Sequence, residues 1–329
     1  MRDIYSFVNS IDQYDHVPVQ KVLEGNIENP EITIFIPTYK RSSTLKVAIE
    51  SALNQMGTVE YEIVVVNNDP SGISGETKEF LENYHSDRIY YYVNSENIGL
   101  CGNWNRGMKL ARAEYVAIIC DDDMLGPYFL ESMMTAISEN NRPGMVGVRY
   151  FSFNSKCLPV FQRPEKLQYR NVSKKDFFFC RSLNITGMTV RRDLFYEIGG
   201  YAEEYYPNED TNLIYQAILK DRVIDVEYPL AGYRKEVNLS LTAGTMNAII
   251  LMMEETRRNI AEHEPFARRW IQYFDKELLY GYIRSANAYW DLNIDYKPIF
   301  KHFGFEERKP SWIKMKAMNF LQRLEIKRG

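Results

Sequence analysis

The sequence has few of the residues that mark metal-thiolate, secreted or membrane-spanning proteins. Its 329 residues include four cysteines, and these show neither a disulfide framework nor metal-ligand spacing, which suits a reducing compartment. The four histidines are isolated, and we expect surface or structural roles for them. No run reaches the about 18 apolar residues of a membrane span, and Met1–Tyr5 carries charge where a signal peptide needs an apolar core. We therefore expect a cytoplasmic protein.

A strong net charge is also missing. The chain carries 40 Lys and Arg against 44 Asp and Glu, so its formal net charge is only -4. Without a global positive field, we expect no nucleic-acid partner. The chain is long enough to bury a sizeable core, which favours one large α/β domain followed by a helical region.

Short β-branched segments alternate with amphipathic ones along the first half of the chain. Strands are predicted at 32–37, 61–66, 89–93, 115–120 and 145–150, with helices at 43–53, 77–84, 99–111 and 127–137 between them. Short links between such elements predict a parallel sheet with right-handed crossovers. Further helices are predicted at 192–198, from Glu209 onward and within 245–300. Residues 1–30 are weakly patterned, and no catalytic or binding role is assigned to them.

Polar loops follow three of the predicted strands. These loops are Thr38–Arg41, Asn67–Ser71 and Asp121–Asp123. Open α/β sheets bind ligands outside the carboxyl ends of their strands, so we expect the three loops to line one crevice.

The three consecutive aspartates are the most unusual of these loops. A buried strand cannot contain Asp121, Asp122 and Asp123, so we expect them at its exposed carboxyl end. There they repel one another unless a cation lies between them, and a hard divalent ion with oxygen ligands is the natural candidate. The alternative is a solvated acidic turn. Glu209 and Asp210 have a similar alternative, since acids in the first turn of a helix are ordinary caps and dipole partners.

Taken together, these segments resemble the family 2 glycosyltransferases with the GT-A fold. The resemblance covers roughly residues 31 to 235, and its motifs follow the family's order: Ile36–Arg41, Glu62–Asn68, Asn97–Gly99, Asn103–Asn105, Ala113–Tyr115, Asp121–Asp123, Gly199–Tyr201 and Glu209–Asp210. It implies a Rossmann-like α/β fold, a mostly parallel mixed sheet flanked by helices, with a helical C-terminal extension. It also implies an enzyme that moves a sugar from a nucleotide-sugar donor.

The resemblance assigns a donor site position by position. The residues implied to bind the nucleotide sugar are Pro37, Thr38, Tyr39, Arg41, Asn67, Asn68, Asp69, Asn97, Asn105, Asp121 and Asp122. The family usually has two aspartates after the second strand, where Asn67 and Asn68 stand here. An asparagine can still accept from uracil N3–H and donate to O4, so a UDP-sugar is expected. A turn capped by these side chains is the alternative for this loop. Many relatives carry arginine at Trp104, so the charge that contacts the diphosphate is either missing from this chain or supplied by Lys40, Arg41 or Arg234.

For the metal, the resemblance favours Mg²⁺ or Mn²⁺ held by Asp122 and Asp123. The spacing of an Asp-x-Asp motif offers the alternative pair Asp121 and Asp123, which project to the same side of an extended segment. Family members transfer with inversion, which needs a carboxylate to take the acceptor's proton. By resemblance Asp210 is this catalytic base, with Glu209 beside it.

The implied organisation is an extension at 1–30, a catalytic domain at 31–240 and a helical region at 241–329. The domain divides into a nucleotide-binding half, 31–125, and an acceptor half, 126–240. Within the latter, acceptor recognition is expected from residues 150–185. The acceptor is expected to be a glycan or lipid-linked glycan of a cell-surface polysaccharide, and the sequence assigns no oligomeric state. The alternatives are a non-catalytic nucleotide-sugar-binding scaffold and a nucleotidyltransferase, although the latter usually has a glycine-rich loop after the first strand.

The tail from residue 301 to residue 329 has eight Lys or Arg against three Glu. Ser311 can cap a helix that carries Ile313, Phe320 and Leu324 on one face. Such a helix suits an anionic membrane surface, where lipid-linked acceptors reside. A helix docked on the domain with its basic side in water is the alternative.

Overall fold

One continuous sheet contains the ten strands found in the described residues (3–181, 183–236 and 242–327) of this computed structural model. The strands are β1 (Val19–Leu23), β2 (Ile32–Thr38), β3 (Tyr61–Asn67), β4 (Ile89–Asn94), β5 (Tyr115–Ile118), β6 (Met124–Leu125), β7 (Met145–Phe153), β8 (Tyr169–Asn171), β9 (Met188–Arg191) and β10 (Val223–Arg234). Their order is β1-β4-β3-β2-β5-β9-β7-β10-β6, and β8 pairs with β10.

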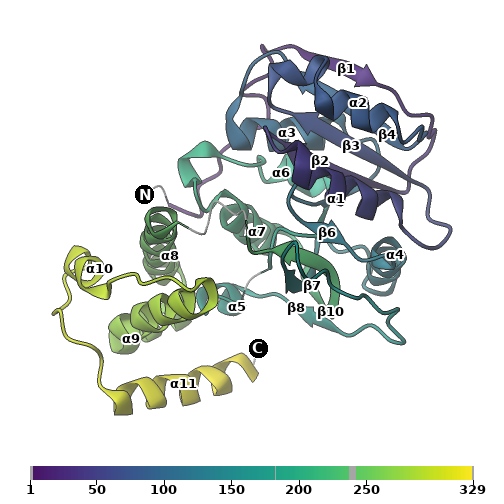
Figure 1. Cartoon of the computed structure of the whole chain (residues 1–329). Helices are drawn as coiled ribbons and strands as arrows, with labels where there is room; N and C mark the ends of the chain where they lie inside the picture. Colours follow the sequence, from purple (N-terminus) through teal and green to yellow (C-terminus); the bar gives the residue numbers. More distant parts are fainter. Residues whose placement is uncertain (1–2, 182, 237–241, 328–329) are drawn as a thin grey trace.

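The helices around this sheet are α1 (Ser42–Leu53), α2 (Glu76–Glu82), α3 (Gly99–Leu110), α4 (Phe129–Glu139), α5 (Lys174–Phe178), α6 (Arg192–Glu197) and α7 (Glu209–Lys220). Two 3₁₀ turns, η1 (Pro70–Ile73) and η2 (Glu203–Tyr205), lie in loops. The C-terminal region adds α8 (Ala243–His263), α9 (Pro265–Trp290), α10 (Tyr296–His302) and α11 (Trp312–Lys327). This arrangement confirms the predicted mixed α/β sheet flanked by helices and followed by a helical region (Figure 1).

The parallel pairing of β4, β3, β2 and β5 follows from buried strands joined through helices. Alternate residues of β2 face opposite layers, since Ile32, Ile34 and Ile36 pack with α1 whereas Phe35 packs with α3. At Gly107 of α3 an added Cβ would lie 2.0 Å from the ring of Phe35, so the glycine allows this helix its close approach. Both faces of the sheet are therefore covered by helices, and the polar loops leave the sheet at the carboxyl ends of its parallel strands.

Residues 1–30 contribute more to the sheet than their weak pattern indicated. Strand β1 lies within them and pairs antiparallel with β4 at the edge of the sheet. Farther back along the chain, the backbone N–H of Ser10 donates to the carbonyl of Gly199, and Arg106 donates to the carbonyls of Tyr14 and Val17. The extension is thus fixed along α3 and the loop after α6.

The C-terminal helices pack on the sheet domain through a shared apolar cluster. Phe177 of α5, Tyr215 of α7 and Trp270 of α9 belong to it, together with Ile4 near the N-terminus and Met318 of α11. Across the described ranges, none of the helices combines the length and the apolar content that a bilayer crossing requires. The predicted boundary between residues 240 and 241 lies outside the described residues.

Candidate active site

A cavity of about 670 Å³ opens at the carboxyl ends of the parallel strands. Its walls bring the three predicted loops together, because residues of Thr38–Arg41, Asn67–Ser71 and Asp121–Asp123 all contribute. Of the residues predicted to bind a nucleotide sugar, those that line it are Pro37, Thr38, Tyr39, Arg41, Asn68, Asn97, Asp121 and Asp122. Asn67, Asp69 and Asn105 are not part of this lining.

The prediction that the three aspartates lie at an exposed strand end is wrong. Strand β5 ends at Ile118, and a turn closed by the N–H of Asp123 on the carbonyl of Cys120 folds the acids inward. Asp121, Asp122 and Asp123 are all buried. Their burial is possible because nearby donors satisfy them, a compensation that the local sequence did not reveal.

The donors to the carboxylates include three side chains and one backbone group, and a fourth side chain donates to a backbone carbonyl of the same turn. Arg41 Nη1 lies 2.6 Å from Asp122 Oδ2 and 3.3 Å from Asp121 Oδ1, and the Thr38 hydroxyl donates to Asp121 Oδ2 at 2.8 Å. The Thr186 hydroxyl and the backbone N–H of Arg234 donate to Asp123. Arg234 Nε donates to the backbone carbonyl of Asp122 at 2.7 Å.

These donors do not offset the whole cost of burying three carboxylates. Burial, followed by the charge of Asp122, raises the pKa of Asp121 to about 6 and that of Asp123 to about 8. Burial also raises the pKa of Asp122, although Arg41 opposes this shift. The cluster therefore has an unmet demand for positive charge.

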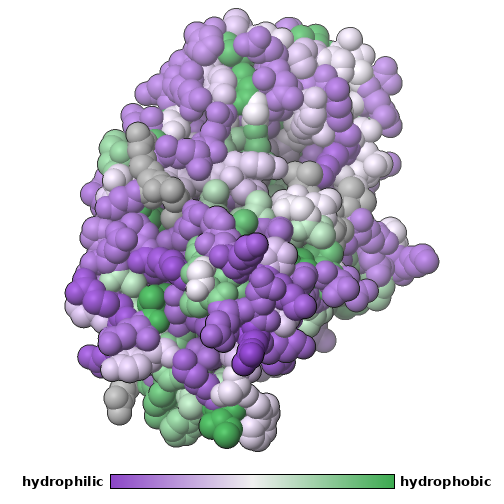
Figure 2. Space-filling model, turned by 90° about the vertical axis from the view of Figure 1, so that its left-hand side faces the viewer, coloured by the Kyte–Doolittle hydropathy of each residue, from purple (hydrophilic) through white to green (hydrophobic). Residues whose placement is uncertain are grey.

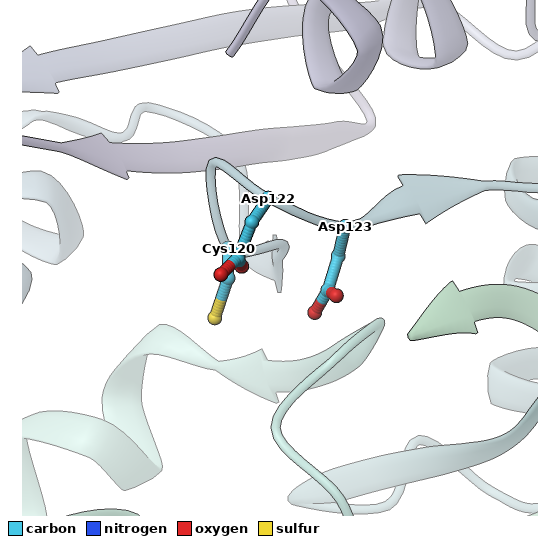
Figure 3. Close-up of side chains that lie close together, drawn as sticks. All are labelled: Cys120, Asp122 and Asp123. Atoms are coloured by element: carbon cyan, nitrogen blue, oxygen red, sulfur yellow. The ribbon is translucent and has the colours of Figure 1, made fainter. Parts of the chain in front are cut away.

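Asp122, Asp123 and Cys120 form a group that can hold a metal ion. One ligand atom from each lies within 4.8 Å of the others, and Figure 3 shows the three side chains pointing to the same side of their loop. Carboxylate oxygens suit Mg²⁺ and Mn²⁺, whereas a thiol is a soft donor. Burial, followed by the charge of Asp123, raises the pKa of the Cys120 thiol well above its usual value, so the thiol stays protonated. The site thus fits a hard cation through its two carboxylates.

The two asparagines at the end of β3 form hydrogen bonds with protein partners. Asn68 donates to Asn97 Oδ1 at 2.8 Å and to the Gly99 carbonyl at 3.0 Å, while its own oxygen accepts from Asn94 and from the Ile98 N–H. Asn67 donates to the hydroxyl of Tyr91 at 2.9 Å. Asp69 caps η1 by accepting from the N–H of Ser71. These contacts match the alternative of a side-chain-capped turn, and they leave no free amide on Asn68 to pair with a base.

Asn105 is also occupied by structural contacts. Its amide donates to the carbonyls of Ser10 and Tyr201, at 3.1 and 2.8 Å, and its oxygen accepts from the Tyr201 N–H. It joins α3 to the N-terminal extension and to the loop after α6, away from the cavity lining. We do not retain Asn105 as a donor-binding residue. Trp104, beside it, does line the cavity.

Glu209 and Asp210 open α7 and differ in their surroundings. Glu209 is buried, and its Oε2 has no hydrogen-bond partner among the described residues. Burial and the charge of Asp210 raise its pKa to about 8. Asp210 is only half-buried, and its Oδ1 accepts from the N–H and the hydroxyl of Thr211 at 2.6 and 3.2 Å. Burial raises the pKa of Asp210 as well, and its hydrogen bonds with Thr211 oppose this shift.

Asp210 belongs to the same electrostatic environment as the aspartate cluster. After burial and the three aspartates, the charge of Asp210 also raises the pKa of Cys120. The structure therefore brings the first turn of α7 and the turn after β5 to one place, although 87 positions separate Asp210 from Asp123 along the chain.

Several cavity residues were missed by the sequence analysis. Among them are Glu203 of η2, whose carboxylate lies beside Gly99, and Tyr206. Tyr14, from the N-terminal extension, donates its hydroxyl to Glu203 at 2.6 Å and holds the carboxylate there. The only signal in the sequence was the position of Glu203 between the Gly199–Tyr201 motif and Glu209–Asp210.

Comparison with known protein families shows to which family the chain belongs. A sequence model described as glycosyl transferase family 2 matches residues 33–199, slightly more than half of the chain. The chain belongs to glycosyl transferase family 2. It is an enzyme with the family's fold, which excludes the scaffold and nucleotidyltransferase alternatives. Glu209 and Asp210 lie beyond the matched residues of this glycosyltransferase.

A curated relative and two solved structures extend the comparison of this glycosyltransferase. The GalNAc(5)-diNAcBac-PP-undecaprenol beta-1,3-glucosyltransferase of Campylobacter jejuni is 26% identical over 277 residues, which cover 83% of this chain and 86% of the relative. Staphylococcus aureus TarS residues 1–349, in complex with UDP-GlcNAc, match with a TM-score of 0.55 at 16% identity, covering 79% of this chain and 73% of that one. Mannosyltransferase PcManGT of Pyrobaculum calidifontis, with GDP-Man and Mn²⁺, matches with a TM-score of 0.52 at 14% identity, covering 96% and 92%. At these identities the structures establish the shared fold.

Proposed function

We propose that this enzyme moves a sugar, with inversion and with a divalent metal, from a nucleotide sugar to a cell-surface glycan or lipid-linked glycan. The observation that carries the proposal is the cavity whose wall includes Arg41 and the Asp121–Asp122 pair, with the Asp210 carboxylate in the same electrostatic environment. A UDP-sugar is the preferred donor, since TarS binds UDP-GlcNAc. PcManGT binds GDP-Man, so GDP-sugars are the alternative donors to be tested. The Campylobacter jejuni relative is named for a polyprenol-linked acceptor, which supports that acceptor class and a hexosyl donor.

In the proposed donor complex, the diphosphate lies against Arg41, whose guanidinium is already held in the cavity wall by two carboxylates. Tyr39, which is exposed at the mouth of the cavity, supplies an aromatic face beside the base. Because the Asn68 side chain is occupied, we assign base recognition to backbone groups and Asn97 rather than to a free asparagine amide.

Asp210 is the proposed general base. It takes the proton from an acceptor hydroxyl as that oxygen forms a bond to the anomeric carbon. The bond from this carbon to the diphosphate oxygen breaks, and the nucleoside diphosphate leaves with the electron pair. Glu209 beside it has a pKa raised to about 8, so at neutral pH its protonated carboxyl adds no second negative charge next to the proposed base.

Asp122 and Asp123 are the proposed metal ligands, each through a carboxylate oxygen. A bound Mg²⁺ or Mn²⁺ would offset charge on the diphosphate and on the leaving nucleotide. We also propose the division of residues 31–240 into a nucleotide-binding half, 31–125, and an acceptor half, 126–240. Most of the cavity lining lies in the first half, and Asp210 lies in the second.

We further propose that α11 rests on an anionic membrane surface. Ile313 and Trp312 are 76% and 68% exposed, and Phe320, on the same helix, is also exposed. Lys316 lies 3.8 Å from the ring centre of Trp312, the combination of a cation and an aromatic that suits a bilayer interface. In Figure 2, which is rotated about the vertical axis, green hydrophobic residues gather at the lower edge, at the height of α11 in Figure 1.

A liposome flotation assay tests the membrane proposal. Vesicles with phosphatidylglycerol should carry the full chain upward, vesicles of phosphatidylcholine alone should carry less, and a chain that ends at Pro310 should stay at the bottom. Equal flotation of the full and the shortened chains would exclude the role of α11.

The test of the donor proposal is thermal-shift binding across UDP-, GDP-, dTDP- and CMP-sugars, each with Mn²⁺ and with chelator. Stabilisation by a UDP-sugar that vanishes with chelator is the expected result. Stabilisation by a GDP-sugar alone would replace the donor, and binding that ignores the chelator would remove the metal from the proposal.

A further inference from the structure

A group of aromatic side chains extends from the aspartate cluster toward the C-terminal helices. Asp123 does not line the nucleotide cavity, and its carboxylate instead accepts from the N–H of Arg234 on β10. Tyr233 precedes Arg234 on β10, and the ring of Tyr150 of β7 packs against that of Tyr233. After burial, the charge of Asp123 is the next cause that raises the pKa of Tyr233, and it also adds to the raised pKa of Tyr150.

Helix α9 completes this group with one of its faces. Tyr282, Tyr289 and Trp290 are spaced by seven and eight residues, so they lie on the same side of the helix. Burial, followed by the charges of Cys180 and Asp210, raises the pKa of Tyr282. The ring centres of Trp290 and Tyr233 lie 5.7 Å apart, and those of Tyr150 and Tyr233 lie 5.4 Å apart. The last turn of α9 therefore packs against β10 next to Arg234, whose backbone N–H binds Asp123.

The outer end of the group presents an aromatic ring, hydroxyls and a cation to solvent. Tyr289 is 40% exposed, and its hydroxyl lies 3.0 Å from that of Tyr150 and 3.4 Å from that of Ser152. Lys235 places its ammonium 3.7 Å from the ring centre of Tyr289 and donates to the carbonyl of the same residue at 3.2 Å. An ammonium has three donor hydrogens, so further donors remain.

We propose that Tyr289, Trp290 and Lys235 form the acceptor subsite and bind the pyranose ring that carries the attacking hydroxyl. This rests on the proposed function, because an acceptor must reach Asp210 from outside the cavity that the donor fills. A pyranose has apolar C–H faces and a rim of hydroxyls. The exposed ring of Tyr289, whose hydroxyl is held by hydrogen bonds, can stack on an apolar face of the pyranose. Lys235 and Ser152 can form hydrogen bonds with the hydroxyls of its rim.

Saturation-transfer NMR with a panel of p-nitrophenyl pyranosides tests the subsite on the full chain in the presence of UDP and Mn²⁺. Tyr289→Ala should raise the Kd of the bound pyranoside by roughly five- to tenfold, because it removes the stacking ring. Tyr289→Phe keeps the ring and should stay within about threefold of the wild type. Tyr196→Ala is the matched control, since Tyr196 of α6 is 41% exposed and lies outside this group.

Lys235→Met keeps the aliphatic stem and should also weaken the pyranoside, so it tests the subsite even if Tyr289→Ala folds poorly. Unchanged affinity in Tyr289→Ala and Lys235→Met would overturn the proposal, as would a wild type that binds UDP but no pyranoside. UDP binding is measured separately by thermal shift. If the wild type bound pyranosides through Tyr289 but bound no nucleotide, the donor assignment would fail while the subsite stood.

Discussion

Nη1 of Arg41 lies 2.6 Å from Oδ2 of Asp122, and this contact holds the positively charged guanidinium in the wall of the cavity before any donor binds. Asp122 is thereby both the partner of Arg41 and a proposed metal ligand. Arg41 is partly exposed whereas Asp122 is buried, so the arginine carries the contact from the protein interior to the cavity. The proposed donor site is therefore pre-organised at Arg41, the residue proposed to contact the diphosphate.

Arg41→Ala should weaken both donor binding and the fold. We expect at least about tenfold weaker nucleotide-sugar binding, because the proposed diphosphate contact is lost. Unfolding should need about 1–3 kcal/mol less at pH 8, since a buried carboxylate loses its donor. Calorimetric titration and urea denaturation measure the two effects. Lys40→Ala removes a charge from the same loop without touching Asp122, and equal losses in both variants would contradict this role of Arg41.

Asp210→Asn should lower kcat by about 10²–10⁴-fold while donor binding stays unchanged. The reason is that the amide cannot take the acceptor's proton, although it fills the same space. Glu209→Gln is the matched control at the adjacent position and should keep most of the activity, because Glu209 is protonated at neutral pH in the wild type. Steady-state kinetics of the two variants decide the assignment, and a reversed order of the losses would make Glu209 the base.

Stability should fall as pH rises through the range set by Glu209. Its pKa is raised from 4.5 in the unfolded chain to about 8 in the fold, mainly by burial. The folded state therefore holds a proton that the unfolded chain has lost. The stabilisation is complete below about pH 4.5 and disappears as pH passes 8. Glu209→Gln should flatten this part of the curve of Tm against pH, and an unchanged slope would place the titration elsewhere.

Removal of the proposed metal ligands should abolish the dependence of donor binding on Mn²⁺. Asp122→Ala and Asp123→Ala each remove one oxygen ligand, and thermal shift with and without chelator should no longer differ. Cys120→Ser should keep the dependence, because a protonated thiol is not expected to bind a hard ion. Asp121→Asn tests the alternative pair of Asp121 and Asp123. If only that variant and Asp123→Ala lost the metal effect, the alternative would be correct.

The first half of the sheet was predictable because several of its buried strands end in polar loops that the sequence displays. Runs such as Ile32–Pro37 and Tyr61–Val66 are mostly apolar, with one polar residue in each (Thr33 and Glu62), which is typical of strands covered on both faces. Local patterns also placed the loops at one sheet edge. By contrast, Val19–Leu23 alternates apolar and polar residues only weakly, so its pairing at the sheet edge could not be read.

The site was less predictable where distant partners decide a residue's role. Burial of the aspartates depends on Arg41, Thr186 and Arg234, none of which is adjacent in sequence. Asn105 matched a motif but serves as a structural link to Ser10. Acceptor recognition within 150–185 stays a prediction. The subsite proposed above includes Tyr289, and nothing in the spacing of α9 indicated that this residue contacts Tyr150 of β7.

Asn68→Asp should destabilise the fold even though related enzymes usually carry aspartate after this strand. Asn68 donates two hydrogen bonds, to Asn97 and to the Gly99 carbonyl, and an aspartate can make neither. The change also places a charge beside carbonyl oxygens in a buried position, so we expect a loss of about 1–3 kcal/mol in the free energy of unfolding. Urea denaturation at pH 8 measures it. Asp69→Asn, in the same loop, keeps the cap on Ser71 and should change little. A stable Asn68→Asp variant with tighter UDP binding would show instead that this side chain reads the base.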